Sequence, residues 1–177
     1  MSNYLLSVSP SVVSLEEAKA HMRINHELDD AYILTLLRAA QLKVEEDTRQ
    51  SFPGAKYKLL TSGKTVDLNR TKSPTISAGF PKAGKDEDSL ETVAAEDFTL
   101  LHRYAFPRVE FESGVDTTAV EIEYTTGTDE VILTLCRMCI LQLCCHWYES
   151  REATAPVELR TVPNNYNDLV AMFSGIN

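Results

Sequence analysis

The sequence predicts an α+β fold, in which three helices and a short C-terminal helix form the core and a small antiparallel β subdomain is inserted between the second and third helices. Three observations support this fold class. Apolar residues recur at helical spacing in the first fifty residues and again in the last fifty. Between these parts, short β-prone runs alternate with turn residues. The length of 177 residues suits a single folded unit.

Two helices are expected near the N-terminus. Ser14 and Glu17 have the spacing of a capping box, so a short helix should run from about Leu15 to Arg23. A polar turn then leads into a second helix that extends to about Gln50, where Phe52-Pro53-Gly54 stops it. The apolar positions of this second helix are Ile33, Leu36, Leu37, Ala40 and Val44.

The middle of the chain should form a small antiparallel sheet. In its last β-prone run, apolar residues alternate with Glu121 and Glu123, as in a strand with one buried face and one wet face. The charged stretch from Lys82 to Ser89 is expected to be a mobile loop. The β-prone runs are Tyr57–Thr61, Thr65–Leu68, Thr75–Ser77, Phe98–Leu101, Val109–Phe111 and Val120–Thr125.

A long third helix is expected from about Glu130 to Glu149, because Gly127 breaks the preceding strand. Its apolar length resembles a membrane span, but it contains Arg137, and an arginine near the centre of a bilayer is costly. We therefore expect a buried core helix and no membrane association. A last short helix should follow Pro163, with one apolar stripe made of Tyr166, Leu169, Val170 and Phe173.

We expect one domain over residues 1–177, built from four consecutive regions. These are the N-terminal helices (1–55), the β subdomain (56–126), the long core helix (127–153) and the C-terminal link with its short helix (154–177). The opening residues MSNYLLSVSP lack the pattern of a signal peptide, which predicts synthesis in a cytoplasm with reduced cysteines.

The chain is acidic along its whole length. It has 26 Asp and Glu against 17 Lys and Arg, a formal net charge of −9. No basic block is present to bind phosphates by releasing counterions, which argues against ordinary nucleic-acid binding. An acidic surface that repels DNA is compatible with this composition.

Four cysteines and a histidine suggest a zinc site, since thiolates and imidazole are the usual ligands of this ion. The residues are Cys136, Cys139, Cys144, Cys145 and His146. On a helix the cysteines point in nearly all directions and cannot converge on one ion, so buried core thiols are expected. The chain also lacks G-x-S-x-G, H-E-x-x-H, P-loop and G-x-G-x-x-G motifs. We expect no catalysis, metal or cofactor; a small hydrolase or metal enzyme using His146 is the chemical alternative.

Two polar segments are candidates for interactions. The acidic cluster Glu45–Asp47 near the end of the second helix is either a solvated face or a charge placed for a partner subunit. At the end of the third helix, Trp147 and Tyr148 provide large amphipathic area. Arg151 is expected to bond another element or a neighbouring chain, although a helix end anchored on its own core is the plainer interpretation.

Four segments, taken in their order and spacing, resemble the head-tail connector (head-completion or adaptor) proteins of long-tailed bacteriophages. They cover most of the chain, and their combination is more specific than any one of them. The segments are Ser14–Ile24 (SLEEAKAHMRI), Glu27–Asp30 (ELDD), Ile122–Gly127 (IEYTTG) and Trp147–Glu152 (WYESRE).

The resemblance implies a structural virion protein, synthesised in the cytoplasm of a bacterial host and located at the head-tail interface. About twelve copies would form a homo-oligomeric ring beneath the portal. The ring would line the DNA exit channel, let DNA pass without specific binding, and join the portal to stopper or tail-completion proteins. No enzymatic activity is implied.

The resemblance also suggests interface residues with the portal or with neighbouring subunits. Trp147, Tyr148 and Arg151 would brace the end of the long helix. The candidate portal contacts are Tyr166, Leu169, Val170 and Phe173. The alternative function is a host-protein-binding module that docks a bacterial protein on the apolar C-terminal helix.

Overall fold

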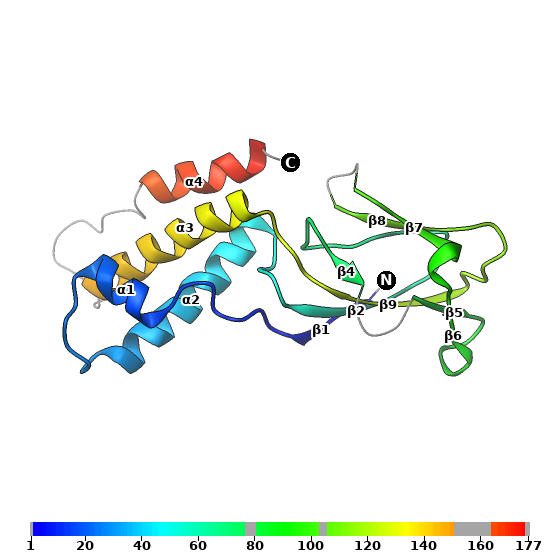
Figure 1. Cartoon of the computed structure of the whole chain (residues 1–177), viewed down its shortest axis with the longest axis horizontal. Coiled ribbons are helices and arrows are strands. Elements are labelled where there is room, and N and C mark those ends of the chain that lie inside the picture. Colours follow the sequence, from blue (N-terminus) through cyan, green and yellow to red (C-terminus); the bar gives the residue numbers. More distant parts are fainter. Residues whose placement is uncertain (1, 77–80, 103–105, 151–163, 176–177) are drawn as a thin grey trace. The chain divides into compact units, whose positions relative to one another are not determined.

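The computed structural model describes residues 2–76, 81–102, 106–150 and 164–175, which contain four α-helices and two antiparallel sheets (Figure 1). The α+β class predicted from the sequence is therefore confirmed. The chain divides into two compact units: a β unit, Met1–Pro10 with Gln50–Asp129, and a helical unit, Ser11–Arg49 with Glu130–Asn177. The N-terminal residues thus join the β unit, whereas the sequence placed them with the helices.

The helical unit contains four helices: α1 (Leu15–Met22), α2 (Asp30–Thr48), α3 (Glu130–Glu149) and α4 (Asn164–Gly175). Helix α3 has the bounds that were predicted. Ser14 is the N-cap residue of α1, and its hydroxyl accepts a hydrogen bond from the backbone N–H of Glu17. Both α1 and α2 end on an arginine in the left-handed region, Arg23 and Arg49, so α2 stops before Phe52 is reached.

The capping box forms only in part. Ser14 caps the helix as predicted, but the carboxylate of Glu17 accepts a hydrogen bond from Arg137 on α3 at 2.6 Å. An ion pair with a second helix satisfies this carboxylate, which sequence spacing alone would assign to the backbone of residue 14.

Helix α3 packs against α1, α2 and α4. Its most buried residues include Cys139, Ile140 and Leu143, and the buried residues of α2 include Ile33 and Val44. By length and composition alone α3 could cross a membrane, and the core helices of folded domains meet the same criterion. Its packing against three other helices supports the prediction of a core helix.

The β unit contains two antiparallel sheets, where the sequence predicted one. The larger has the strand order β1-β2-β9-β5-β6, with β4 also paired to β9, and the smaller has the order β3-β8-β7. The strands are β1 (Ser2–Ser7), β2 (Lys56–Thr61), β3 (Thr65–Asp67), β4 (Thr75–Ile76), β5 (Lys82–Gly84), β6 (Glu91–Thr92), β7 (Phe98–Leu101), β8 (Arg108–Phe111) and β9 (Ala119–Thr125).

Strand β9 is the centre of the larger sheet, and its predicted alternation is confirmed. Val120, Ile122 and Tyr124 are buried, whereas Glu121 lies on the other face and pairs with Lys58 at 2.8 Å. The ring of Tyr124 stacks on Tyr57 with centroids 5.6 Å apart, and its hydroxyl donates to the carbonyl of Asn69. Burial raises the pKa of Tyr124 to about 12. The stacking contact and the hydrogen bond together fix the position of Tyr124 on the buried face of the larger sheet.

The stretch from Lys82 to Ser89 is not a loop throughout, so that prediction was wrong. Residues 82–84 form β5, which pairs with β9 on one side and β6 on the other. A short 3-10 turn follows at Glu87–Ser89. A Cβ on Gly84 would lie 2.8 Å from the carbonyl oxygen of Ser89, so the glycine permits a close approach of the two backbones.

Thr126 and Gly127, just after β9, lie in close contact with the backbone of other segments of the β unit. The hydroxyl of Thr126 donates to the carbonyl of Phe52 at 2.5 Å and accepts from the N–H of Ala55. At Gly127, a Cβ would lie 2.0 Å from the carbonyl oxygen of Ser73. Only a residue without a side chain fits at this position, which gives a physical reason for the glycine that ends the IEYTTG segment.

Candidate functional site

The candidate interface residues lie on two elements of the helical unit. Trp147 and Tyr148 are half-buried in the last turn of α3. The candidate portal contacts, Tyr166, Leu169, Val170 and Phe173, are on α4. Arg151 lies outside the described residues. Phe173 is within α4, but its side chain is also outside what the structure describes.

Tyr148 connects the end of α3 to the start of α2. Its hydroxyl donates to the carboxylate of Asp29 at 2.5 Å, and its ring lies 6.2 Å from that of Tyr32. Asp29 is the residue before α2, and its side chain makes no capping bond to that helix. The Tyr148 contact therefore ties the C-terminal end of α3 to the N-terminal end of α2.

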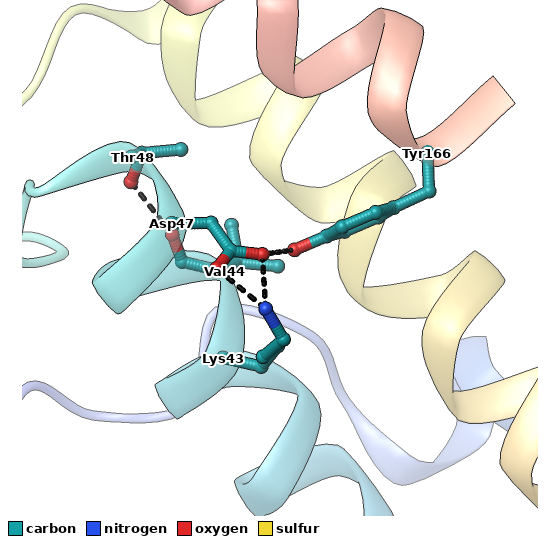
Figure 2. Close-up of polar contacts among 5 residues, drawn as sticks. All are labelled: Lys43, Val44, Asp47, Thr48 and Tyr166. Carbon is teal, nitrogen blue, oxygen red and sulfur yellow. Dashed lines mark hydrogen bonds and ion pairs between the residues drawn. The ribbon is translucent and has the colours of Figure 1, made fainter. Parts of the chain in front are cut away.

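A second polar cluster holds α4 on the other end of α2 (Figure 2). The hydroxyl of Tyr166 donates to the carboxylate of Asp47, and the ammonium group of Lys43 bonds the same carboxylate at 2.5 and 2.6 Å. Tyr166 is only 3% exposed. One carboxylate thus accepts bonds from its own helix and from α4.

The pKa shifts of this cluster agree with its geometry. Burial on its own would raise the pKa of Asp47, but the hydrogen bonds from Lys43 and Tyr166, together with the charge of Lys43, hold it below its usual value. Burial and the bond to the carboxylate raise the pKa of Tyr166. Both shifts favour a neutral phenol that donates to an ionised carboxylate.

The acidic cluster Glu45–Asp47 is therefore not a solvated face throughout. Glu45 is 9% exposed and Asp47 is bonded by two partners, while Glu46 is exposed. The solvated-face interpretation was wrong for Glu45, whereas Asp47 is exposed and is also bonded by Lys43 and Tyr166. A role for the cluster at a partner subunit stays a prediction.

The apolar stripe of α4 faces its own protein. Tyr166 is buried, Leu169 and Val170 are half-buried, and α4 packs against α2 and α3. The exposed residues of this helix are Asn165, Asn167, Asp168, Ala171 and Met172. Among the stripe residues, Tyr166 is thus a structural contact of the helical unit.

Two further ion pairs, which the sequence analysis did not find, join the helices. Arg137 on α3 bonds Glu17 on α1 at 2.6 Å, and Lys19 on α1 bonds Asp30 on α2 at 2.7 Å. Partly exposed pairs of this kind stabilise modestly and mainly set the register between helices. No local sequence signal marks them, because each joins residues of different helices.

The cysteines are core residues, as predicted for most of them. Cys136, Cys139 and Cys144 are buried, and burial raises their pKa values to about 12, 11 and 11. Cys145 is half-buried; burial and then Glu149 raise its pKa. Thiols that stay protonated at neutral pH are poor nucleophiles and poor metal ligands. Within the described residues, no group of three or more His, Cys, Asp or Glu is arranged to hold a metal ion.

We expect thiol reagents to discriminate among the cysteines. In the folded protein at pH 8, Cys145 should react first and slowly, while the three buried thiols react only after unfolding. A Cys145→Ser variant should lose the early phase. Mass spectrometry of the labelled protein measures the order, and early labelling of Cys136 or Cys139 would contradict the packing of α3.

We also expect the Asp47 cluster to contribute to acid stability. Because the folded pKa of Asp47 is below its usual value, its contribution is present above pH ~4 and is lost as the pH falls through the folded pKa. Tyr166→Phe removes one of the bonds that lower this pKa, so the variant should lose less stability than the wild type between about pH 5 and 2. Urea unfolding at several pH values measures the difference. The other carboxylates are the same in the wild type and the variant, so their contributions to the pH dependence of stability cancel in the comparison. Parallel curves of unfolding free energy against pH for the two proteins would refute the expectation.

Several polar contacts of the helical unit join one helix to another. Residues 12–83 match the sequence model of the family described as "Phage gp6-like head-tail connector protein". The resemblance found in the sequence is therefore confirmed over these residues.

Solved structures with a similar fold come from gene transfer agent particles. A chain of the neck of an empty particle computed with C6 symmetry has a TM-score of 0.71 at 19% identity, and covers 98% of this chain and 95% of its own. A chain of the native virion has a TM-score of 0.70 at 20% identity, with the same coverage. A chain of the native neck computed with C12 symmetry has a TM-score of 0.70 at 21% identity, and covers 98% and 94%. No curated protein matches the sequence.

Proposed function

We propose that this chain is a head-tail connector, a structural virion protein without enzymatic activity, which forms a ring beneath the portal, surrounds the DNA exit channel and joins the portal to stopper or tail-completion proteins. The observation that carries the proposal is the match of residues 12–83 to head-tail connector proteins. The shared fold with neck chains, whose particles were computed with C6 and C12 symmetry, supports a ring of about twelve copies.

Charge supports passage of DNA without specific binding. Each copy carries a net charge of −9, which a ring multiplies around its lumen. Phosphates are repelled by such a surface and gain nothing from counterion release. DNA would therefore slide through the channel without adhering to it.

For contact with the portal we retain α4 as the proposed element, with Leu169, Val170 and Phe173 as candidate contacts. Tyr166 would act by holding this helix on Asp47, because its side chain is already buried. Trp147 and Arg151 remain candidates at the end of α3. The alternative is a host-protein-binding module that uses the same helix, and the match of residues 12–83 to head-tail connector proteins does not favour it.

The test is to delete the gene from its phage and complement it with the wild-type copy. We expect the deletion to yield DNA-filled heads that lose their genome and fail to join tails, with both defects reversed by complementation. Reconstruction of complemented particles should place the protein as a ring between portal and tail. Particles that lack the protein yet retain DNA and carry tails would overturn the proposal.

A further inference from the structure

Strand β1 leaves an apolar sheet edge unprotected. It lies at one end of the larger sheet, and among the described strands its neighbour is β2, with Tyr4 opposite Lys58 and Leu5 opposite Tyr57. All six of its residues are exposed. Tyr4, Leu5 and Leu6 are each about half exposed, at 51%, 52% and 51%.

The side chains of β1 are apolar on both faces of the sheet. Successive residues of a regular strand point to opposite faces, so Tyr4 and Leu5, which are paired in register with Lys58 and Tyr57, lie on opposite faces, while Leu6 lies at an irregularity of the register. The first ten residues contain no charged side chain. Edge strands usually carry charges or proline to prevent pairing with another chain. An uncharged apolar edge of six residues is instead suited to accept an additional strand.

The described part of the chain offers four other sheet edges, and they differ in charge and length. Strand β6 carries Glu91, β3 carries Asp67, and β4, which is uncharged, has only two residues. Strand β7, Phe98–Leu101, has the uncharged sequence FTLL and pairs with β8 on one side. Its Thr99 is exposed, whereas Phe98 and Leu100 pack against the core of the β unit. Strand β7 is therefore the edge that best resembles β1.

We propose that β1 of one copy pairs with β7 of the next copy, so that strand addition links successive subunits. This inference rests on the proposed ring. Copies with a net charge of −9 repel one another, and the repulsion is smallest where both contacting surfaces are uncharged. A ring also requires head-to-tail contacts between two different surfaces of each subunit, and β1 and β7 are two different edges. The four residues of β7 fit within the six of β1.

The test uses the full chain with one edge charged at a time. Leu5→Lys charges β1, and Leu6→Lys does so independently at a second exposed position of the strand. Thr99→Lys charges β7 at a position that does not enter the core. Each variant should self-associate at least about tenfold more weakly than the wild type, equivalent to a loss of about 1.4 kcal/mol, as measured by native mass spectrometry over a concentration series. Circular dichroism checks that each variant is folded.

Mixing the variants tests the pairing itself. Leu5→Lys retains a working β7 and Thr99→Lys retains a working β1, so the mixture should form a one-to-one complex and stop there. Dimers of Thr99→Lys alone would show that β1 pairs with β1 and would overturn the proposal. A mixture that stays monomeric, or a wild-type chain that is monomeric at every concentration, overturns it as well.

Two matched substitutions serve as controls. Thr92→Lys places the same charge on β6, and Leu28→Lys places it on the most exposed leucine of the helical unit. Both should associate as the wild type does, and an equal loss in Thr92→Lys would refute the choice of β7. Rings that persist in the Leu5→Lys and Thr99→Lys variants would reject this pairing while leaving the connector function intact. A failed gene deletion test would reject the function regardless of these results.

Discussion

Gly127→Ala should destabilise the β unit by about 3 kcal/mol or more, the upper part of the range for an overpacked site. The added Cβ would lie 2.0 Å from the carbonyl oxygen of Ser73, well inside van der Waals contact. The obstacle is backbone, which no change of side-chain rotamer can move away. The hydroxyl of Thr71 also donates a hydrogen bond to the carbonyl of Gly127, so a shift of the backbone at Gly127 would weaken that bond.

Urea unfolding followed by far-ultraviolet circular dichroism measures this effect. Gly114→Ala is the comparison, because a Cβ there meets nothing within 4 Å and the cost comes only from its φ of +118°. The Gly127 variant should be the less stable of the two, and it should also lose the protected amides of β9. An unchanged unfolding midpoint for Gly127→Ala would mean that the approach of Ser73 is not as close as the structure has it.

Tyr166→Ala should release α4 from the helical unit. The substitution removes a buried ring and the hydrogen bond to Asp47, and truncation of a large buried aromatic residue costs about 3–5 kcal/mol. The effect should be local at first, since α4 is docked by one face on α2 and α3. Amide exchange in residues 164–175 should become fast while α3 stays protected.

The matched control is Met172→Ala on the exposed side of the same helix, where the side chain is 52% exposed. This change should alter stability by no more than about 0.5 kcal/mol and leave exchange in α4 unchanged. Equal exchange in both variants would contradict the docking of α4 through Tyr166. If α4 contacts the portal as proposed, the Tyr166 variant should also bind the portal more weakly.

Elements with a strong local pattern could be predicted from the sequence. Helix α3 has the predicted bounds because its polar residues cluster on one side and Gly127 precedes it. Strand β9 was predicted because one of its faces is buried, which produces alternation. Strand β1 was missed for the opposite reason: neither face is buried, so its sequence has no alternation to detect.

The rest depends on contacts between distant residues. Lys82-Ala83-Gly84 has weak strand preference, and pairing with β9 nevertheless makes it a strand. Asp47 could be recognised as acidic and as four residues from Lys43, but its second partner, Tyr166, lies 119 residues away. Tyr148 and Tyr166 could be selected from the sequence as interface candidates, a role that stays a prediction, whereas their carboxylate partners within the chain needed the fold.

The order in which the chain is synthesised constrains when each unit can fold. The β unit has all its strands once residue 125 has emerged, although β1 must wait for β2, which begins at Lys56. Helices α1 and α2 are made early, yet the helix that covers their apolar faces begins only at Glu130. A nascent or truncated chain therefore exposes an uncovered helical pair, and only the finished polypeptide offers a complete subunit for assembly.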